Sequence, residues 1–128
     1  NVKLHNFLNY KKIPMILASS KIVLMPYEKK VGVSIKGLDV SEYISPLKLF
    51  DYLASGSVII ASKKKAYDHI LKNKINSFLV DNYDVEIWCD LISKIINGKL
   101  DVKNVKKNAV ITAKKYTWLK RAEKILKC

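Results

Sequence analysis

The first part of the chain contains three segments whose hydrophobic and polar residues predict secondary structure. Residues 2–7 (VKLHNF) alternate between apolar and polar, which predicts a strand. Residues 13–18 carry Pro14 in their first turn and predict a short helix. Residues 22–25 are a continuous apolar run ended by Pro26, typical of a strand buried on both faces. This order of strand, helix and strand predicts a parallel sheet with crossover helices.

The central stretch, residues 45–56 (SPLKLFDYLASG), carries signals for both ends of a helix. Ser45 can cap the first backbone N–H groups, and Pro46 suits the first helical position. Gly56 supplies the left-handed residue that ends such a helix. One apolar face at helical spacing would pack on the sheet, and it comprises Leu47, Phe50, Leu53 and Ala54.

Lys48 and Asp51 remain near the N-terminal end of this helix, one turn apart. A helix N-terminus with a lysine beside it attracts phosphate, because its N–H donors and its dipole favour negative charge. A carboxylate one turn further on can accept two hydrogen bonds from a vicinal diol such as a ribose. Phosphate and ribose together indicate a nucleotide. The same two side chains also suit an ordinary ion pair on a solvated helix face, and the residue types alone leave that alternative open.

The second half repeats the alternation of strands and helices. Strands are expected over residues 57–61 and 77–80, and helices over 67–71, 84–97, 102–115 and 117–127. Asp84 and Thr117 are candidate caps for two of these helices. The helix over 84–97 carries an apolar stripe that is expected in the core, made of Ile87, Trp88, Leu91, Ile92, Ile95 and Ile96.

Three basic or polar segments bear on function. A long polar loop, residues 27–44, connects a strand to the central helix at the sheet edge where open α/β sheets bind ligands. Lys63, Lys64 and Lys65 follow the next strand at that edge, where such a run is typical of solvated surface and could also add positive potential near a diphosphate. The last helix is basic and amphipathic, so both packing against the protein's own body and contact with an anionic membrane stay open.

Composition narrows the function classes. The chain has 128 residues, 49% of them hydrophobic, which suits one folded domain. No apolar run approaches the ~18 residues of a membrane span. Cys89 and Cys128 form no metal-ligand spacing and fit a reducing cytoplasm.

The net charge of +13 comes almost entirely from lysine, with Arg121 the single arginine. Base readout favours arginine and stacked aromatics, so no nucleic-acid partner is expected, and a basic nucleic-acid-binding domain is only an alternative.

The central stretch resembles the donor-binding helix of GT-B-fold group 1 (retaining) glycosyltransferases, S-P-L-K-[LV]-F-E-Y-M-A-x-G followed by a buried strand. Residues 45–50 match as they stand, and Asp51 and Leu53 replace the usual Glu and Met. The resemblance extends over nearly the whole chain, through residues 20–27 (SKIVLMPY) and through Tyr116-Thr117-Trp118 followed by Ala122.

The resemblance implies an α/β fold with a Rossmann-like parallel sheet flanked by helices, the C-terminal half of a GT-B fold. Residues 1–128 would be its donor-binding domain, without its first strands and without the N-terminal acceptor domain. The implied activity is sugar transfer from a nucleotide-sugar to a glycan or lipid-linked acceptor in the bacterial cytoplasm, with peripheral contact at the inner face of the cell membrane left open. The chain opens inside a predicted strand and without a methionine, so we expect a piece of a longer protein with no turnover alone.

By position, the resemblance assigns Asp51 to the ribose hydroxyls. It assigns Ser45, Leu47 and Lys48 to the diphosphate, largely through backbone amides. No metal cofactor is expected, because the helix terminus and basic side chains stabilise the leaving diphosphate in this fold.

Two further assignments concern the base and the donor sugar. Phe7 and Leu8 would lie near the base. Tyr43 stands where many relatives carry a second Glu that meets the donor sugar, and Glu42 is adjacent. This replacement leaves open a non-catalytic α/β binding module as an alternative function.

Overall fold

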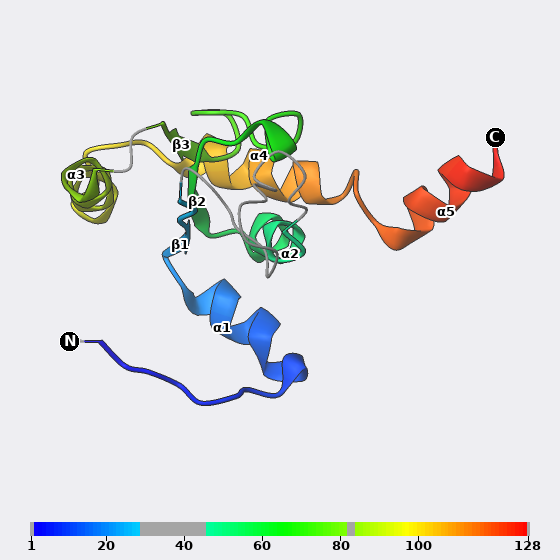
Figure 1. The fold of residues 1–128 in the computed structure, drawn as a ribbon, viewed down its shortest axis with the longest axis horizontal. Coiled ribbons are helices and arrows are strands. Elements are labelled where there is room, and N and C mark those ends of the chain that lie inside the picture. The colour runs from blue at the N-terminus through cyan, green and yellow to red at the C-terminus, as the bar shows by residue number, and fades with distance from the viewer. Residues whose placement is uncertain (1, 29–45, 82–83, 128) are drawn as a thin grey trace, which may run out of the picture.

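The computed structural model describes residues 2–28, 46–81 and 84–127. Within these ranges three strands form one parallel sheet in the order β1-β2-β3. The strands are β1 (Ile22–Met25), β2 (Val58–Ser62) and β3 (Phe78–Val80). The helices are α1 (Ile13–Ser19), α2 (Lys48–Ser55), α3 (Val85–Ile96), α4 (Lys103–Ala113) and α5 (Trp118–Leu126), with short 3-10 turns η1 (Tyr10–Lys12) and η2 (Lys65–Tyr67). The predicted α/β fold with helices flanking a parallel sheet is confirmed (Figure 1).

The core lies on both faces of β2, which is buried along its whole length. Because side chains alternate along a strand, Ile59 and Ala61 join one cluster, and Val58 and Ile60 join the other. The first cluster includes the buried side of α2, and the second includes Ile95 of α3. α2 and α3 therefore cover opposite faces of the sheet (Figure 1).

The prediction of a strand over residues 2–7 is wrong. These residues carry no regular secondary structure, and Val2, Leu4 and Phe7 are 87%, 93% and 100% exposed. An extended segment becomes a strand only when a neighbour pairs with its backbone. None of the described residues pairs with this segment, since β1 pairs only with β2. Period-two alternation is a property of one segment, and it does not supply that partner.

β1 forms where it is predicted, but it is not buried on both faces. It lies at the edge of the described sheet, and Leu24 is 42% exposed. Val23 and Met25, on the other face, are buried. A continuous apolar run therefore marks a strand buried on both faces in the central strand β2, whereas the edge strand β1 is buried on one face only.

α2 ends as predicted at Gly56, whose φ of 73° is left-handed, but its start and its buried face differ from the prediction. The helix begins at Lys48, and Pro46 precedes it. Its buried side chains are Leu49 and Leu53, whereas Leu47 is 75% exposed. The predicted apolar face began at Leu47, whereas the buried face begins at Leu49, so the prediction combined exposed positions with buried ones.

The helix ends elsewhere follow the sequence signals. Asp84 caps α3 by accepting a hydrogen bond from the amide of Glu86 (2.9 Å), and Thr117 caps α5 by accepting one from the amide of Lys120 (3.2 Å). The helix predicted over residues 67–71 is instead the 3-10 turn η2 followed by a turn. The apolar stripe of α3 packs on the second cluster, except for Ile87 and Ile96, which are exposed.

α5 extends away from the sheet (Figure 1). Its apolar residues Trp118, Leu119, Ile125 and Leu126 are 65–86% exposed, so the described residues do not cover its apolar face. None of the helices within the described ranges is both long enough and apolar enough to cross a membrane.

Candidate functional site

The N-terminal end of α2 lies at the edge of the sheet where the parallel strands end. Tyr27 comes two residues after β1, and Ser62 is the last residue of β2. The Tyr27 amide donates to the Ser62 hydroxyl (2.8 Å), and this hydroxyl donates to the Tyr27 carbonyl (3.0 Å). The ammonium of Lys48, the first residue of α2, lies 4.9 Å from the centre of the Tyr27 ring. The tip of α2 therefore faces the ligand-binding edge expected for an open parallel sheet.

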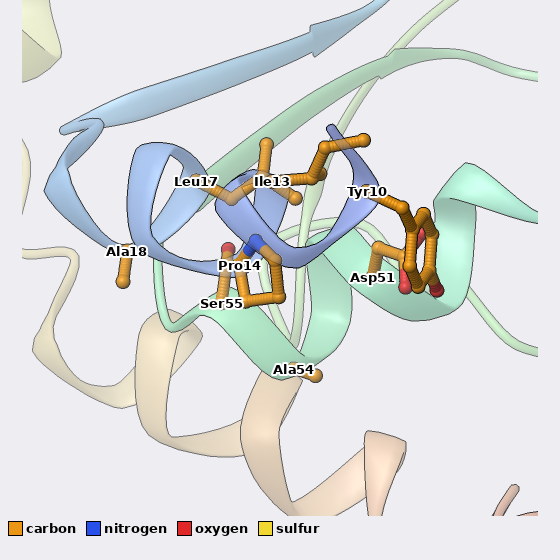
Figure 2. Close-up of a pocket in the computed structure, with 8 residues that line it drawn as sticks. All are labelled: Tyr10, Ile13, Pro14, Leu17, Ala18, Asp51, Ala54 and Ser55. Atoms are coloured by element: carbon orange, nitrogen blue, oxygen red, sulfur yellow. The ribbon is translucent and has the colours of Figure 1, made fainter. Parts of the chain in front are cut away.

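Asp51 lines a pocket of about 280 Å³ between α1 and α2. The ring of Tyr10 and the carboxyl group of Asp51 lie at one end of this pocket, with Ala18 at the other end (Figure 2). The remaining lining is mostly apolar and comprises Ile13, Pro14, Leu17, Ala54 and Ser55. An exposed acid at the mouth of a partly apolar hollow suits a ligand with a polar end and a flat apolar part.

The alternative use of Lys48 and Asp51 as an ordinary ion pair is not seen. Lys48 contacts the ring of Tyr27, and the ion pairs between described residues do not join it to Asp51. Among the described residues the two charged groups are therefore not paired with each other, and one lies at the helix tip and the other at the pocket.

The other residues assigned from sequence are brought together only in part. Leu47 lies at the tip of α2 and is exposed. Phe7 is fully exposed and does not line the pocket, while Leu8 is partly buried. Ser45 and Tyr43 lie outside the described residues.

Sequence reasoning missed Tyr10. It lies in the turn that follows residues 2–7, and η1 carries it to the same end of the pocket as Asp51 (Figure 2). The available signal was an aromatic residue just before a helix that begins with a proline, in the turn that the resemblance places near the base.

The lysine run after β2 is solvated surface at two of its three positions, because Lys63 and Lys65 are exposed. Lys63 pairs with Asp81 (3.0 Å), and Lys64 is 8% exposed and donates to the carbonyl of Glu28. Lys64 is thus a structural residue that holds the chain after β1.

A metal site is not apparent in the parts of the chain that the structure describes, since they contain no group of three or more metal-ligating side chains. Cys89 is a free, exposed thiol on α3.

The comparisons with known proteins give a family and a fold. The chain matches the family described as "Glycosyl transferases group 1" over residues 1–112. No curated protein matches it. A solved structure of Anabaena Alr3699/HepE in complex with UDP-glucose is similar, with a TM-score of 0.67 and 14% sequence identity. The similarity covers 91% of this chain and 30% of that chain, so this chain spans about a third of that protein.

At 14% identity the structural similarity shows the fold alone, whereas the family match covers most of the chain. The fold that was implied by the resemblance and the fold of the solved structure agree. This chain belongs to the group 1 glycosyl transferase family.

Proposed function

We propose that this chain is the donor-binding part of a glycosyltransferase that moves a sugar from a nucleotide-sugar to a glycan or lipid-linked acceptor. Family membership supports the transferase class. The acceptor would be bound by a further domain of the full-length enzyme. The Anabaena protein was solved with UDP-glucose, which makes a UDP-sugar the first donor to test.

The observation that carries the proposal is the position of α2. Its first turn is closed by bonds from the amide of Leu49 to the carbonyl of Pro46 (2.9 Å) and from the amide of Phe50 to the carbonyl of Leu47 (3.2 Å). A diphosphate at this tip would therefore meet the amides of Leu47 and Lys48, together with the Lys48 ammonium.

Asp51 would take the ribose. It lies one turn beyond the tip, at the pocket shared with Tyr10. A nucleoside whose ribose hydroxyls donate to Asp51 would place its base toward the pocket between α1 and α2. The carboxylate would accept two charge-assisted hydrogen bonds, each stronger than a bond between neutral groups.

The same arrangement would serve the reaction. When the bond between sugar and diphosphate breaks, negative charge grows on the leaving diphosphate. Donors that are already oriented toward that charge stabilise the transition state without reorganising. The helix tip and Lys48 would supply such donors from the protein alone, in line with the expectation that no metal is required.

Nucleotide binding to the full-length enzyme tests this function. UDP or GDP should raise its melting temperature, and DNA or RNA should not. Asp51→Ala should weaken nucleotide affinity by about 100- to 10,000-fold, the value of two hydrogen bonds to a charged group at about 1.5–3 kcal/mol each. Asp51→Glu, which restores the family's usual residue, should bind well, and Asp90→Ala on α3 is the matched control.

Four outcomes would contradict parts of the proposal. Unchanged affinity in Asp51→Ala would refute the ribose assignment. Protection by nucleic acid and not by nucleotide would favour the basic nucleic-acid-binding alternative. Tight nucleotide binding without transfer to any acceptor would favour the non-catalytic module. The 128 residues alone should show no turnover, and any turnover by them would contradict the need for a further domain.

A further inference from the structure

We propose that Tyr27 is a positioning residue that holds the Lys48 ammonium at the tip of α2. This inference rests on the proposed function, because it concerns how the lysine is kept where the donor's diphosphate would bind. Neither the sequence motif nor the family match assigns a role to this tyrosine.

The backbone of Tyr27 is fixed by β2. Its amide donates to the Ser62 hydroxyl and its carbonyl accepts from the same hydroxyl, at 2.8 and 3.0 Å. Ser62 is 3% exposed, so these two bonds are shielded from water. A residue that follows an edge strand is thereby tied to the central strand of the sheet.

The ring of Tyr27 is fixed by packing. It packs on the first core cluster, and its centre lies 6.5 Å from that of the Tyr67 ring at an angle of 44°. Tyr67 is 1% exposed, and its hydroxyl donates to the carbonyl of Ser62. One residue of β2 therefore anchors both tyrosines.

The ring then presents its π-electrons to Lys48. The Lys48 ammonium lies 4.9 Å from the ring centre, within the range of a cation–π contact. A lysine side chain free in solvent samples many rotamers and loses that freedom when it binds an anion. A lysine already resting on a fixed ring loses less, so the ring should strengthen diphosphate binding in particular.

The test is a double-mutant cycle for nucleotide affinity in the full-length enzyme. UDP and GDP are the probes, and uridine and guanosine serve as probes without phosphate. Tyr27→Leu should weaken binding of the better nucleoside diphosphate by about two- to five-fold and leave nucleoside affinity unchanged. It should cause no further loss in a Lys48→Ala background, because the ring would then have no cation to hold.

Two further variants separate positioning from folding. Tyr27→Phe keeps the ring and the backbone bonds, so it should bind as the wild type does. Tyr52→Leu removes a ring that packs on the same cluster from within α2 and has no lysine of the described residues over it, so it reports the effect of lost packing alone. Melting temperatures of all variants show which of them remain folded.

The results distinguish the inference from the function beneath it. If Lys48→Ala weakens diphosphate binding but Tyr27→Leu does not, or weakens nucleosides equally, the role of Tyr27 is overturned and the function stands. The role also fails if the two losses simply add in the double variant. If Lys48→Ala has no effect, or neither UDP nor GDP binds, the proposed diphosphate site itself is wrong and the inference falls with it.

Discussion

The orientation of α2 decides whether Asp51 reaches the pocket, and a pair of leucine substitutions tests that orientation. Leu49 is 2% exposed and belongs to the first core cluster, whereas Leu47 is 75% exposed. In a helix two residues apart point in nearly opposite directions. A helix turned to bury Leu47 would carry Asp51 away from α1.

The expected magnitudes differ widely. Leu49→Ala removes three buried carbon groups at about 0.8 kcal/mol each and leaves a cavity, so the free energy of unfolding should fall by about 2–5 kcal/mol. Leu47→Ala should change it by less than about 0.5 kcal/mol, because the side chain is already in water. Both substitutions are the same chemical change at the start of the same helix, so differences in helix propensity largely cancel.

Urea unfolding followed by far-UV circular dichroism measures this difference. A loss of about 3 kcal/mol lowers the urea midpoint by about 1–3 M at typical slopes. Equal losses in the two variants, or a larger loss in Leu47→Ala, would refute the observed orientation of α2 and with it the placement of Asp51.

Three smaller predictions follow from single positions, each measured by the same unfolding assay. Gly56→Ala should lower stability by about 1–2 kcal/mol, because its φ of 73° strains a residue with a Cβ, although that Cβ would meet only Val110 at an ordinary 3.8 Å. Lys74→Gly should raise the free energy of unfolding by about 0.5–1 kcal/mol, because Lys74 has a left-handed φ of 60° that glycine adopts without strain. A lower free energy of unfolding would show that contacts of the Lys74 side chain outweigh this backbone strain. Ser57→Ala should cost about 1–3 kcal/mol, because this buried hydroxyl lies 2.8 and 2.7 Å from the carbonyl oxygens of Leu17 and Ser20 and shares its single proton between them, and an unchanged midpoint would show that water replaces it.

Features that depend on local chemistry were predictable from the sequence. Asp84 and Thr117 cap helices, and Gly56 ends one, because each acts through backbone groups within a few residues. The buried strand β2 was predictable because a strand covered on both faces is apolar along its whole length.

Features that depend on distant partners were not predictable. The alternation in residues 2–7 predicts a strand, but it does not reveal that this segment has no pairing partner among the described residues. The apolar run of β1 predicts a strand, but it does not reveal that this strand lies at the edge of the described sheet. The contact between Lys48 and Tyr27 joins residues 21 positions apart, and only the packed sheet edge brings them together.

In the candidate site, too, residues that are close in sequence were predictable and contacts between distant residues were not. Lys48 and Asp51 lie on one helix, so their spacing and the family motif were enough to select them. Tyr10 and Asp51 line one pocket from different elements, η1 and α2, and no local sequence pattern records that juxtaposition. The lysines after β2 were selected by charge alone, and charge does not reveal that Lys63 pairs with the Asp81 carboxylate or that Lys64 donates to the backbone carbonyl of Glu28.

A crystal structure of the full-length enzyme with UDP or GDP, whichever binds, tests the central claim most directly. The account predicts diphosphate oxygens within hydrogen-bond distance, about 2.7–3.2 Å, of the Leu47 and Lys48 amides, and both ribose hydroxyls on Asp51. A nucleotide bound elsewhere, or an α2 tip covered by other protein, would contradict it.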